Sequence, residues 1–305
     1  MTHLSWPALP YEAWKDTYET LHMWMQIIGK IRLVRMPWLN HCWQVTLYPT
    51  ASGLTTGRMP YGTEGLQIDF DFVDHELSVR TSRGERRTIA LAPMSVAEFY
   101  RAVTAALAAL GMPVRIYRRP SEVESRVPFD HDVAHRSYDA DAVHRCWRAL
   151  ASSAEVFQRF RARYYGKVSP VHFFWGAFDL AVTRFSGRVA PPHPGGIPNL
   201  PDRVTRDAYS HEVSSCGFWP GGAIAPYPLF YSYAYPEPKG YAGAAVQPAS
   251  ARYDATLHEF ILPYDDVREA SDPEEKLLAF LQSSYEAAAG LGAWDRKSLE
   301  VASGT

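Results

Sequence analysis

The feature that most constrains the fold is an order of patterns, helix then strands then helix, that occurs twice along the chain. A first helix is predicted from apolar residues at alternating spacings of four and three, which form one helical face: Trp14, Tyr18, Leu21, Met25 and Ile28. Strict alternation from Leu66 to Phe72 follows and predicts a half-buried strand. The next helix begins at Ser95, where Glu98 completes a capping box. This first unit is expected to cover residues 1–112.

The second half has the same order of patterns. A helix is predicted from about Asp139, and the last helix from Asp272-Pro273, where Asp272 is the N-cap. Between them the strand-like segments are Val171–Phe185, Phe230–Tyr235 and Leu257–Leu262.

Short strings support a degenerate duplication. Gly29-Lys30-Ile31 recurs as Gly166-Lys167-Val168, and His41 would align with His172 in the sheet. We therefore expect an α+β fold, with two degenerate helix–strands–helix repeats that form a largely antiparallel sheet covered by helices. The Pro-rich segment 113–138 would link the first unit to the second, over 139–305.

Composition excludes several classes of function. The chain is 47% hydrophobic and 21% charged, as is typical of a globular protein, and its net charge of -2 leaves no basic surface for nucleic acid. It has no run of about 18 apolar residues that would span a membrane. Its first residues lack the pattern of a signal peptide, so we expect a cytoplasmic protein. Three scattered cysteines indicate neither a disulfide framework nor a zinc ribbon.

Most of the candidate chemistry lies between Ser186 and Phe230, a stretch that reads as a long loop inserted in the second repeat over 186–229. Histidines, hydroxyl groups and paired glycines alternate there with apolar residues such as Val213 and Phe218. Long loops within compact domains are usually functional. We expect this loop to be ordered and to pack over the sheet.

Four strings resemble a bacterial family known only as a domain of unknown function. They are Ser169-Pro-Val-His-Phe-Phe-Trp-Gly, Pro191-Pro-His-Pro-Gly-Gly, Ser210-His-Glu-Val-Ser-Ser and Tyr231-Ser-Tyr-Ala-Tyr-Pro-Glu-Pro. Leu21-His22 and Pro37-Trp38-Leu39-Asn40-His41 resemble it too, so the resemblance covers nearly the full length. It implies membership of a family but no reaction.

The strongest candidate site is a metal centre. His172, His193 and His211 are the predicted ligands of a divalent ion, Fe or Zn, because imidazoles with one carboxylate suit these metals. Glu212 would be a fourth ligand or a general base, and Asp179 a second catalytic carboxylate. Two features weaken this hypothesis: the histidines form no local motif, and adjacent residues of an extended chain point to opposite faces.

Other residues are predicted to line the pocket beside that centre. Trp175, Trp219 and Tyr233 would be its walls. Arg184 would pair with Asp179 or hold a substrate carboxylate.

The leading functional hypothesis is a metal-dependent enzyme, an oxygenase or a hydrolase, that acts on a small apolar or aromatic molecule. The alternative is a metal-free protein that binds a small ligand in an aromatic pocket, and a third possibility is an interaction module. Covalent catalysis by Cys216 with His193 or His211 as its base also stays open. The expected partner in the first two hypotheses is a small molecule, and the oligomeric state is left open.

Overall fold

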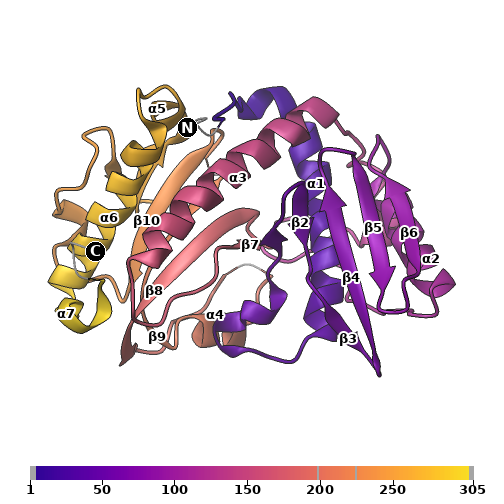
Figure 1. The fold of residues 1–305 in the computed structure, drawn as a ribbon, viewed down its shortest axis with the longest axis horizontal. Coiled ribbons are helices and arrows are strands. Elements are labelled where there is room, and N and C mark those ends of the chain that lie inside the picture. The colour runs from indigo at the N-terminus through magenta and orange to yellow at the C-terminus, as the bar shows by residue number, and fades with distance from the viewer. Residues whose placement is uncertain (1–4, 198, 224, 302–305) are drawn as a thin grey trace.

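The computed structural model describes residues 5–197, 199–223 and 225–301, which form helices and two antiparallel sheets (Figure 1). The first sheet has the order β1-β2-β4-β5-β6, and β3 also pairs with β4. Its strands are β1 (Tyr48–Pro49), β2 (Gly53–Thr55), β3 (Met59–Tyr61), β4 (Glu64–Asp71), β5 (Glu76–Thr81) and β6 (Arg86–Ala90). The predicted strand from Leu66 to Phe72 is the central β4, so the α+β prediction is confirmed.

The second sheet has the order β11-β12-β10-β9-β8-β7. Its strands are β7 (His172–Phe174), β8 (Asp179–Val189), β9 (His211–Trp219), β10 (Leu229–Tyr235), β11 (Arg252–Asp254) and β12 (Glu259–Pro263). Every neighbouring pair is antiparallel, as in the first sheet. Chain order and sheet order nearly coincide, because hairpins and short connections join most neighbours.

Four long helices pack on these sheets, and shorter helical turns lie between them. The α-helices are α1 (Tyr11–Arg35), α2 (Val96–Ala109), α3 (Ala140–Ala162), α4 (Asp202–Ala208), α5 (Tyr264–Arg268), α6 (Pro273–Leu291) and α7 (Arg296–Leu299). The 3-10 helices are η1 (Asn40–Val45), η2 (Phe129–His131) and η3 (Tyr241–Gly243).

The predicted helix starts at Ser95 and Asp272 are confirmed. The Ser95 side chain accepts from the Glu98 backbone N–H, and the Glu98 carboxylate accepts from the Ser95 backbone N–H at 2.8 Å. Asp272 accepts from the Glu275 N–H at 3.0 Å, with Pro273 in the first turn. Each cap satisfies backbone donors that a helix leaves free at its start.

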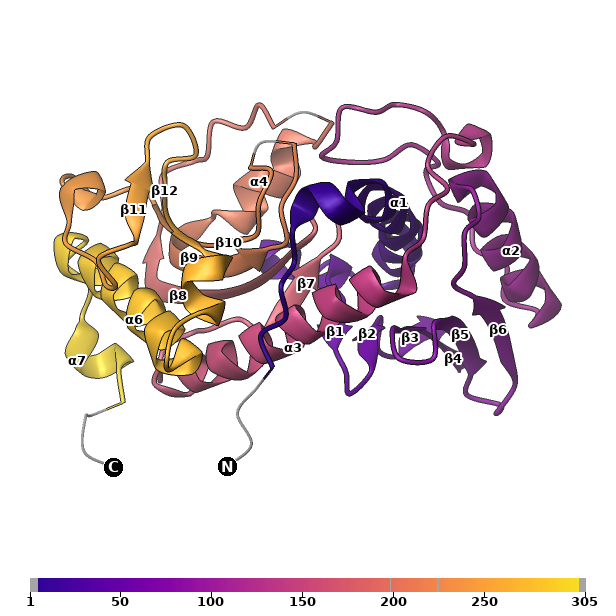
Figure 2. The same ribbon diagram turned by 90° about the horizontal axis from the view of Figure 1, so that it is seen from above.

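The two sheets belong to one body. Leu47 and Phe173 exchange backbone hydrogen bonds of 2.9 and 2.7 Å where β1 approaches β7. One continuous apolar core runs through both halves and includes the stack of Trp24 on Phe99, with ring centroids 4.6 Å apart. In Figure 2, α3 runs from the second sheet toward the first, where it contacts β1. The order helix, strands, helix therefore holds in each half, while the duplication itself stays a prediction.

Two expectations about the halves need correction. His41 is not on a sheet: it lies in η1 with a left-handed backbone, so it does not occupy a position equivalent to His172 in β7. The segment 186–229 is not one loop, because it holds the end of β8, then α4, and the central strand β9. β9 was missed because Ser214, Ser215 and Gly217 interrupt its apolar alternation, although most of it is buried.

Candidate functional site

The second sheet has two different faces. One face carries Phe173, Val182, Phe218 and Phe230 and joins the main core beneath α3 and α6. Because side chains alternate along a strand, the neighbours of these residues point the other way. This second face, which we call the tyrosine face, carries Asp179, Ser215, Gly217, Tyr231, Tyr233, Tyr235 and Glu259. It places polar and titratable groups side by side.

Tyr231 lies across the strand next to its own. The Tyr231 hydroxyl donates to Asp179 Oδ2, two strands away. To reach it, the Tyr231 side chain passes over Gly217 of the strand between them. A Cβ at Gly217 would lie 2.3 Å from Tyr231 Oη and 2.4 Å from the Leu180 carbonyl oxygen, so only glycine fits. Burial raises the pKa of Asp179 to about 6, although the Tyr231 hydrogen bond opposes this shift.

A second pair of phenols lies beside the first. The hydroxyls of Tyr209 and Tyr233 are 2.8 Å apart. The His193 ring stacks on Tyr209 with centroids 4.9 Å apart and lies 5.0 Å from Tyr235. The Gly195 N–H donates to His193 Nδ1 at 3.0 Å, so in the neutral ring the proton is on Nε2.

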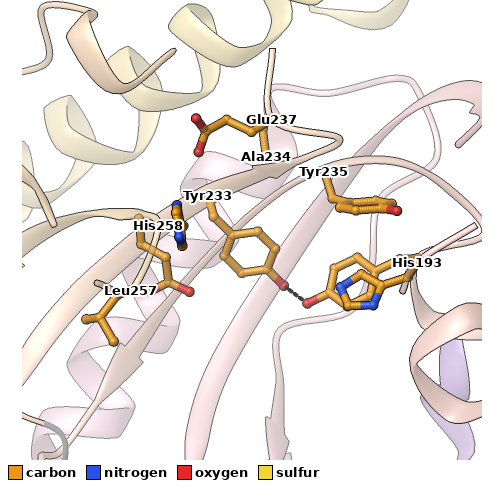
Figure 3. Close-up of a pocket in the computed structure, with 9 residues that line it drawn as sticks. His193, Tyr233, Ala234, Tyr235, Glu237, Leu257 and His258 are labelled. Carbon is orange, nitrogen blue, oxygen red and sulfur yellow. Dashed lines mark hydrogen bonds between the residues drawn. The ribbon is translucent and has the colours of Figure 1, made fainter. Parts of the chain in front are cut away.

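These rings border a cleft of about 490 Å³ (Figure 3). It is lined by His193, Tyr209, Tyr233, Ala234, Tyr235, Glu237, Leu257, His258 and Glu259. In Figure 3 the Tyr233 ring points across the cleft to the ring on which His193 stacks, and His258 lies on the opposite side. The cleft therefore offers aromatic faces, phenol and imidazole groups and carboxylates.

Glu122 brings a further carboxyl group to the tyrosine face from segment 113–138. Its backbone is left-handed, with φ 61, and its carboxyl lies over Gly176, where a Cβ would be 2.0 Å from Glu122 Oε1. Gln26 anchors the preceding residue: it accepts from the Ser121 N–H and donates to the Ser121 carbonyl, both at 2.7 Å. Lys30 Nζ donates to Ser121 Oγ at 2.7 Å. Segment 113–138 thus contributes a carboxyl group that Asp179 influences through its charge, although none of its residues lines the cleft.

Three carboxyl groups influence one another here. Desolvation by the surrounding protein and the charge of Asp179 raise the pKa of Glu122 to about 7, and the charge of Lys30 opposes this shift. Solvent still reaches the Glu122 side chain. Burial, with Asp179 and Asp254, raises the pKa of Glu259 to about 8. All three carboxyls also raise the pKa of Tyr209, after its burial. Of the three, Glu259 lines the cleft, and carboxyls that titrate near neutral pH beside a cleft are typical of functional sites.

The three predicted metal ligands do not converge. His172 is fully buried beside Trp43 and Phe174, and burial lowers its pKa to about 3. It pairs with Ala181 of β8, whereas His211 pairs with Val189 of the same strand. At about 3.3 Å per residue, this separation far exceeds the roughly 3–4 Å between ligands of one ion. His193 lines the cleft, and neither His172 nor His211 is among the lining residues.

In the part of the chain that the structure describes, no three His, Cys, Asp or Glu side chains are arranged to hold a metal ion. The sequence-based ligand set therefore needs correction. The physical reason is that β8 is eleven residues long and its two ends hold different histidine neighbours.

The two predicted catalytic carboxylates have different surroundings. Asp179 lies on the tyrosine face, as described above. Glu212 instead accepts from Ser186 Oγ at 2.8 Å and forms an ion pair with Arg188 at 2.7 Å. Arg188 also donates to the Gly292 carbonyl near the end of α6, so Glu212 contributes to holding the C-terminal segment.

Two predicted pocket residues are elsewhere. Arg184 is on the opposite face of β8 from Asp179, where its guanidinium stacks on Phe160 at 3.5 Å and on Tyr285 at 4.3 Å. Trp175 packs against Gly29 of α1 and donates to the Val45 carbonyl at 2.7 Å. Both are structural because their polar groups bind the protein's own backbone or rings.

Tyr233 and Trp219 share the tyrosine face. Tyr233 lines the cleft. Trp219 packs against a small apolar cluster that includes Leu229 and Ile261. Cys216 faces the main core, where burial raises the pKa of its thiol to about 12, which opposes a nucleophilic role.

Sequence reasoning missed Tyr209, Glu259 and Glu122. Glu259 had one usable signal, because a carboxylate at the start of the strand-like run before Leu262 needs a reason. Tyr209 ends a short helix within the assumed loop, and Glu122 lies in the assumed linker, where no periodic pattern singles it out.

The fold and the site define a class: an α+β protein with a cleft rich in tyrosine and carboxyl groups on one of its two sheets. The chain belongs to the family of unknown function DUF5996, which matches residues 6–301. This match confirms the resemblance seen in the sequence and covers nearly all of its 305 residues. No curated protein and no solved structure gives a significant match. Among the described helices, none is long and apolar enough to cross a membrane.

Proposed function

We propose that this protein binds a small organic cation in the cleft of the tyrosine face. The observation that carries the proposal is the lining of the 490 Å³ cleft, in which aromatic rings and carboxyl groups border one space. That volume lies within the range of about 300–1,000 Å³ that is usual for small-ligand sites.

The charges on the cleft favour a cation over an anion. Glu237 and Glu259 line it, and no lysine or arginine is among its lining residues in the described ranges. Asp179 lies behind the rings and acts on Glu259 through its charge. Burial and the charge of Asp179 keep Glu259 mostly protonated near neutral pH, and a cation in the cleft would offset this effect and favour the ionised carboxylate.

The aromatic rings of the cleft would also attract a cation. Tyr209, Tyr233 and Tyr235 expose faces or edges toward the cleft, beside His193 (Figure 3). A cation over an aromatic face gains about 0.5–2 kcal/mol, with the larger gain where water is excluded. Quaternary ammonium groups suit such cages because they attract rings and do not need hydrogen bonds.

Calorimetry with choline tests this proposal, with 3,3-dimethyl-1-butanol as its uncharged isostere. We expect choline to bind at least about tenfold more tightly, a difference of about 1.4 kcal/mol. Glu259→Gln should weaken choline binding by about tenfold, because it removes a carboxylate beside the rings. Glu155→Gln, on the exposed part of α3, is the matched control and should leave binding unchanged. Equal affinity for both probes, or no binding of either, would contradict the proposal.

An enzyme that uses these carboxyls as acid and base is the second candidate. It is favoured by the pKa values of Asp179, Glu122 and Glu259, raised to about 6, 7 and 8, because an acid–base catalyst works best near the pH at which it titrates.

The metal-dependent form of that enzyme has a direct test. Because the predicted ligands are separated, we expect elemental analysis of the purified protein to find well below one ion of iron or zinc per chain. One ion per chain that His172→Ala or His211→Ala removes would restore the metal-centre hypothesis.

A further inference from the structure

A strained dipeptide lies away from the cleft, in η1. His41 and Cys42 are consecutive non-glycine residues with left-handed backbones, at φ 59 and φ 58. Such conformations persist only where surrounding contacts impose them, and they are frequent at functional sites. Here α4 imposes them: Asp207 accepts from the Cys42 N–H at 3.2 Å, and the Ala208 carbonyl lies 3.0 Å from His41 Nδ1.

These contacts set the protonation of the His41 ring. Because a carbonyl oxygen only accepts, Nδ1 carries the proton, and Nε2 of the neutral ring has a free lone pair. Burial lowers the pKa of His41, and the charges of Lys167 and His211 lower it further. Lys167 Nζ lies 2.5 Å from this Nε2. The ring is therefore oriented to accept a proton from the lysine.

Lys167 is reachable and partly desolvated. Its side chain is exposed, yet Nζ lies 5.4 Å from the Trp43 ring centroid and 4.9 Å from that of Phe185. Burial lowers its pKa, and only the more distant Asp207 opposes this shift. Within the described residues no carboxylate forms an ion pair with Lys167. Asp207 is engaged by Cys42 and Trp38.

An amine, a base and a group that orients the base are the parts of an activated nucleophile. Here the amine is Lys167, whose Nζ lies 2.5 Å from His41 Nε2. The base is His41, and the Ala208 carbonyl oxygen, 3.0 Å from Nδ1, orients its ring. We propose that Lys167 is a nucleophilic amine that forms a Schiff base with a small aldehyde, and that His41 accepts its proton. This site is separate from the cleft and does not depend on its ligand.

The step is balanced without an oxidant or a reductant. Lys167 transfers a proton to His41 Nε2, and the free amine adds to the carbonyl carbon to give a carbinolamine. His41 returns the proton to the hydroxyl that leaves as water, and the C=N bond of the imine forms. The products are one protonated imine and one water, and His41 is neutral again.

Labelling of the full-length protein with pyridoxal and cyanoborohydride at neutral pH tests this proposal. Cyanoborohydride traps the imine, and mass mapping gives the rate at each lysine. We expect Lys167 to react at least about tenfold faster than the exposed Lys15, Lys239 and Lys297, because His41 is placed to accept its proton and burial lowers its pKa. A Lys167 rate equal to theirs would overturn the proposal.

His41→Asn separates the base from the fold. Asparagine tolerates the left-handed backbone but accepts no proton from an ammonium group. We expect the variant to keep the wild-type circular dichroism while the rate at Lys167 falls to that of Lys239. Undiminished labelling of Lys167 in the folded variant would overturn the role of His41. Lys167→Arg should abolish that label and leave the others unchanged, which assigns the signal.

Discussion

Gly217→Ala is expected to lower the free energy of unfolding by about 3 kcal/mol, at the upper end of the cost of overpacking a core. The added Cβ would lie 2.3 Å from Tyr231 Oη and 2.4 Å from the Leu180 carbonyl oxygen. The tyrosine ring can move only by giving up its hydrogen bond to Asp179, and the carbonyl belongs to the β8–β9 ladder. Urea unfolding followed by fluorescence measures the loss.

The matched control for this change is Gly290→Ala. Gly290 lies near the end of α6, and among the described residues no atom outside the helix lies within 4 Å of the position that an added Cβ would take. Alanine favours helix over glycine by about 0.5–1 kcal/mol, so this variant should be as stable as the wild type or slightly more stable. If Gly217→Ala matched this control, the close passage of Tyr231 over β9 would be wrong.

The sequence was sufficient to predict the elements with strong periodicity. The apolar face of α1, the alternation in β4 and the cap residues Ser95 and Asp272 all depend on neighbours within a few positions. Local physical chemistry decides such features, so one sequence is enough to find them.

The site depended on contacts that no local pattern records. Asp179 and Tyr231 are 52 positions apart and meet only because β8, β9 and β10 are neighbours. Polar residues and a glycine interrupt the apolar pattern of β9, the strand between them, so the local sequence does not indicate that these strands are neighbours. His172 and Arg184 were selected for their chemistry, but both are buried among rings of the protein itself.

Between about pH 6.5 and pH 8, we expect the free energy of unfolding to fall by about 1–2 kcal/mol. The cause is the raised pKa of Glu122, to about 7, and of Glu259, to about 8. A carboxyl with a raised pKa holds its proton more tightly in the folded protein than in the unfolded chain. Its stabilising contribution is complete below the unfolded pKa and is lost as the pH rises through the folded value.

The pKa values of other buried groups set the lower and upper limits of this pH range. Burial lowers the pKa of His22 to about 4 and of His172 to about 3, and these rings add stability as the pH rises, but only up to their unfolded value near 6.5. Burial lowers the pKa of Lys30 to about 8, so its contribution rises mainly above that pH. The carboxyls therefore dominate between these limits. The expected magnitude is below the full shifts because solvent reaches Glu122 and Glu259.

Glu259→Gln separates the carboxyl effect from a general loss of stability. The amide carries no charge at any pH, so the variant should lose about half or more of the wild-type fall between pH 6.5 and pH 8, since Glu259 has the larger shift. Urea midpoints at several pH values in this window measure the slope, and Glu155→Gln on α3 should reproduce the wild-type slope. A wild-type stability that rises across the window would mean that these carboxyls have partners that keep them ionised. The repulsion that favours a cationic ligand in the cleft would then be absent as well.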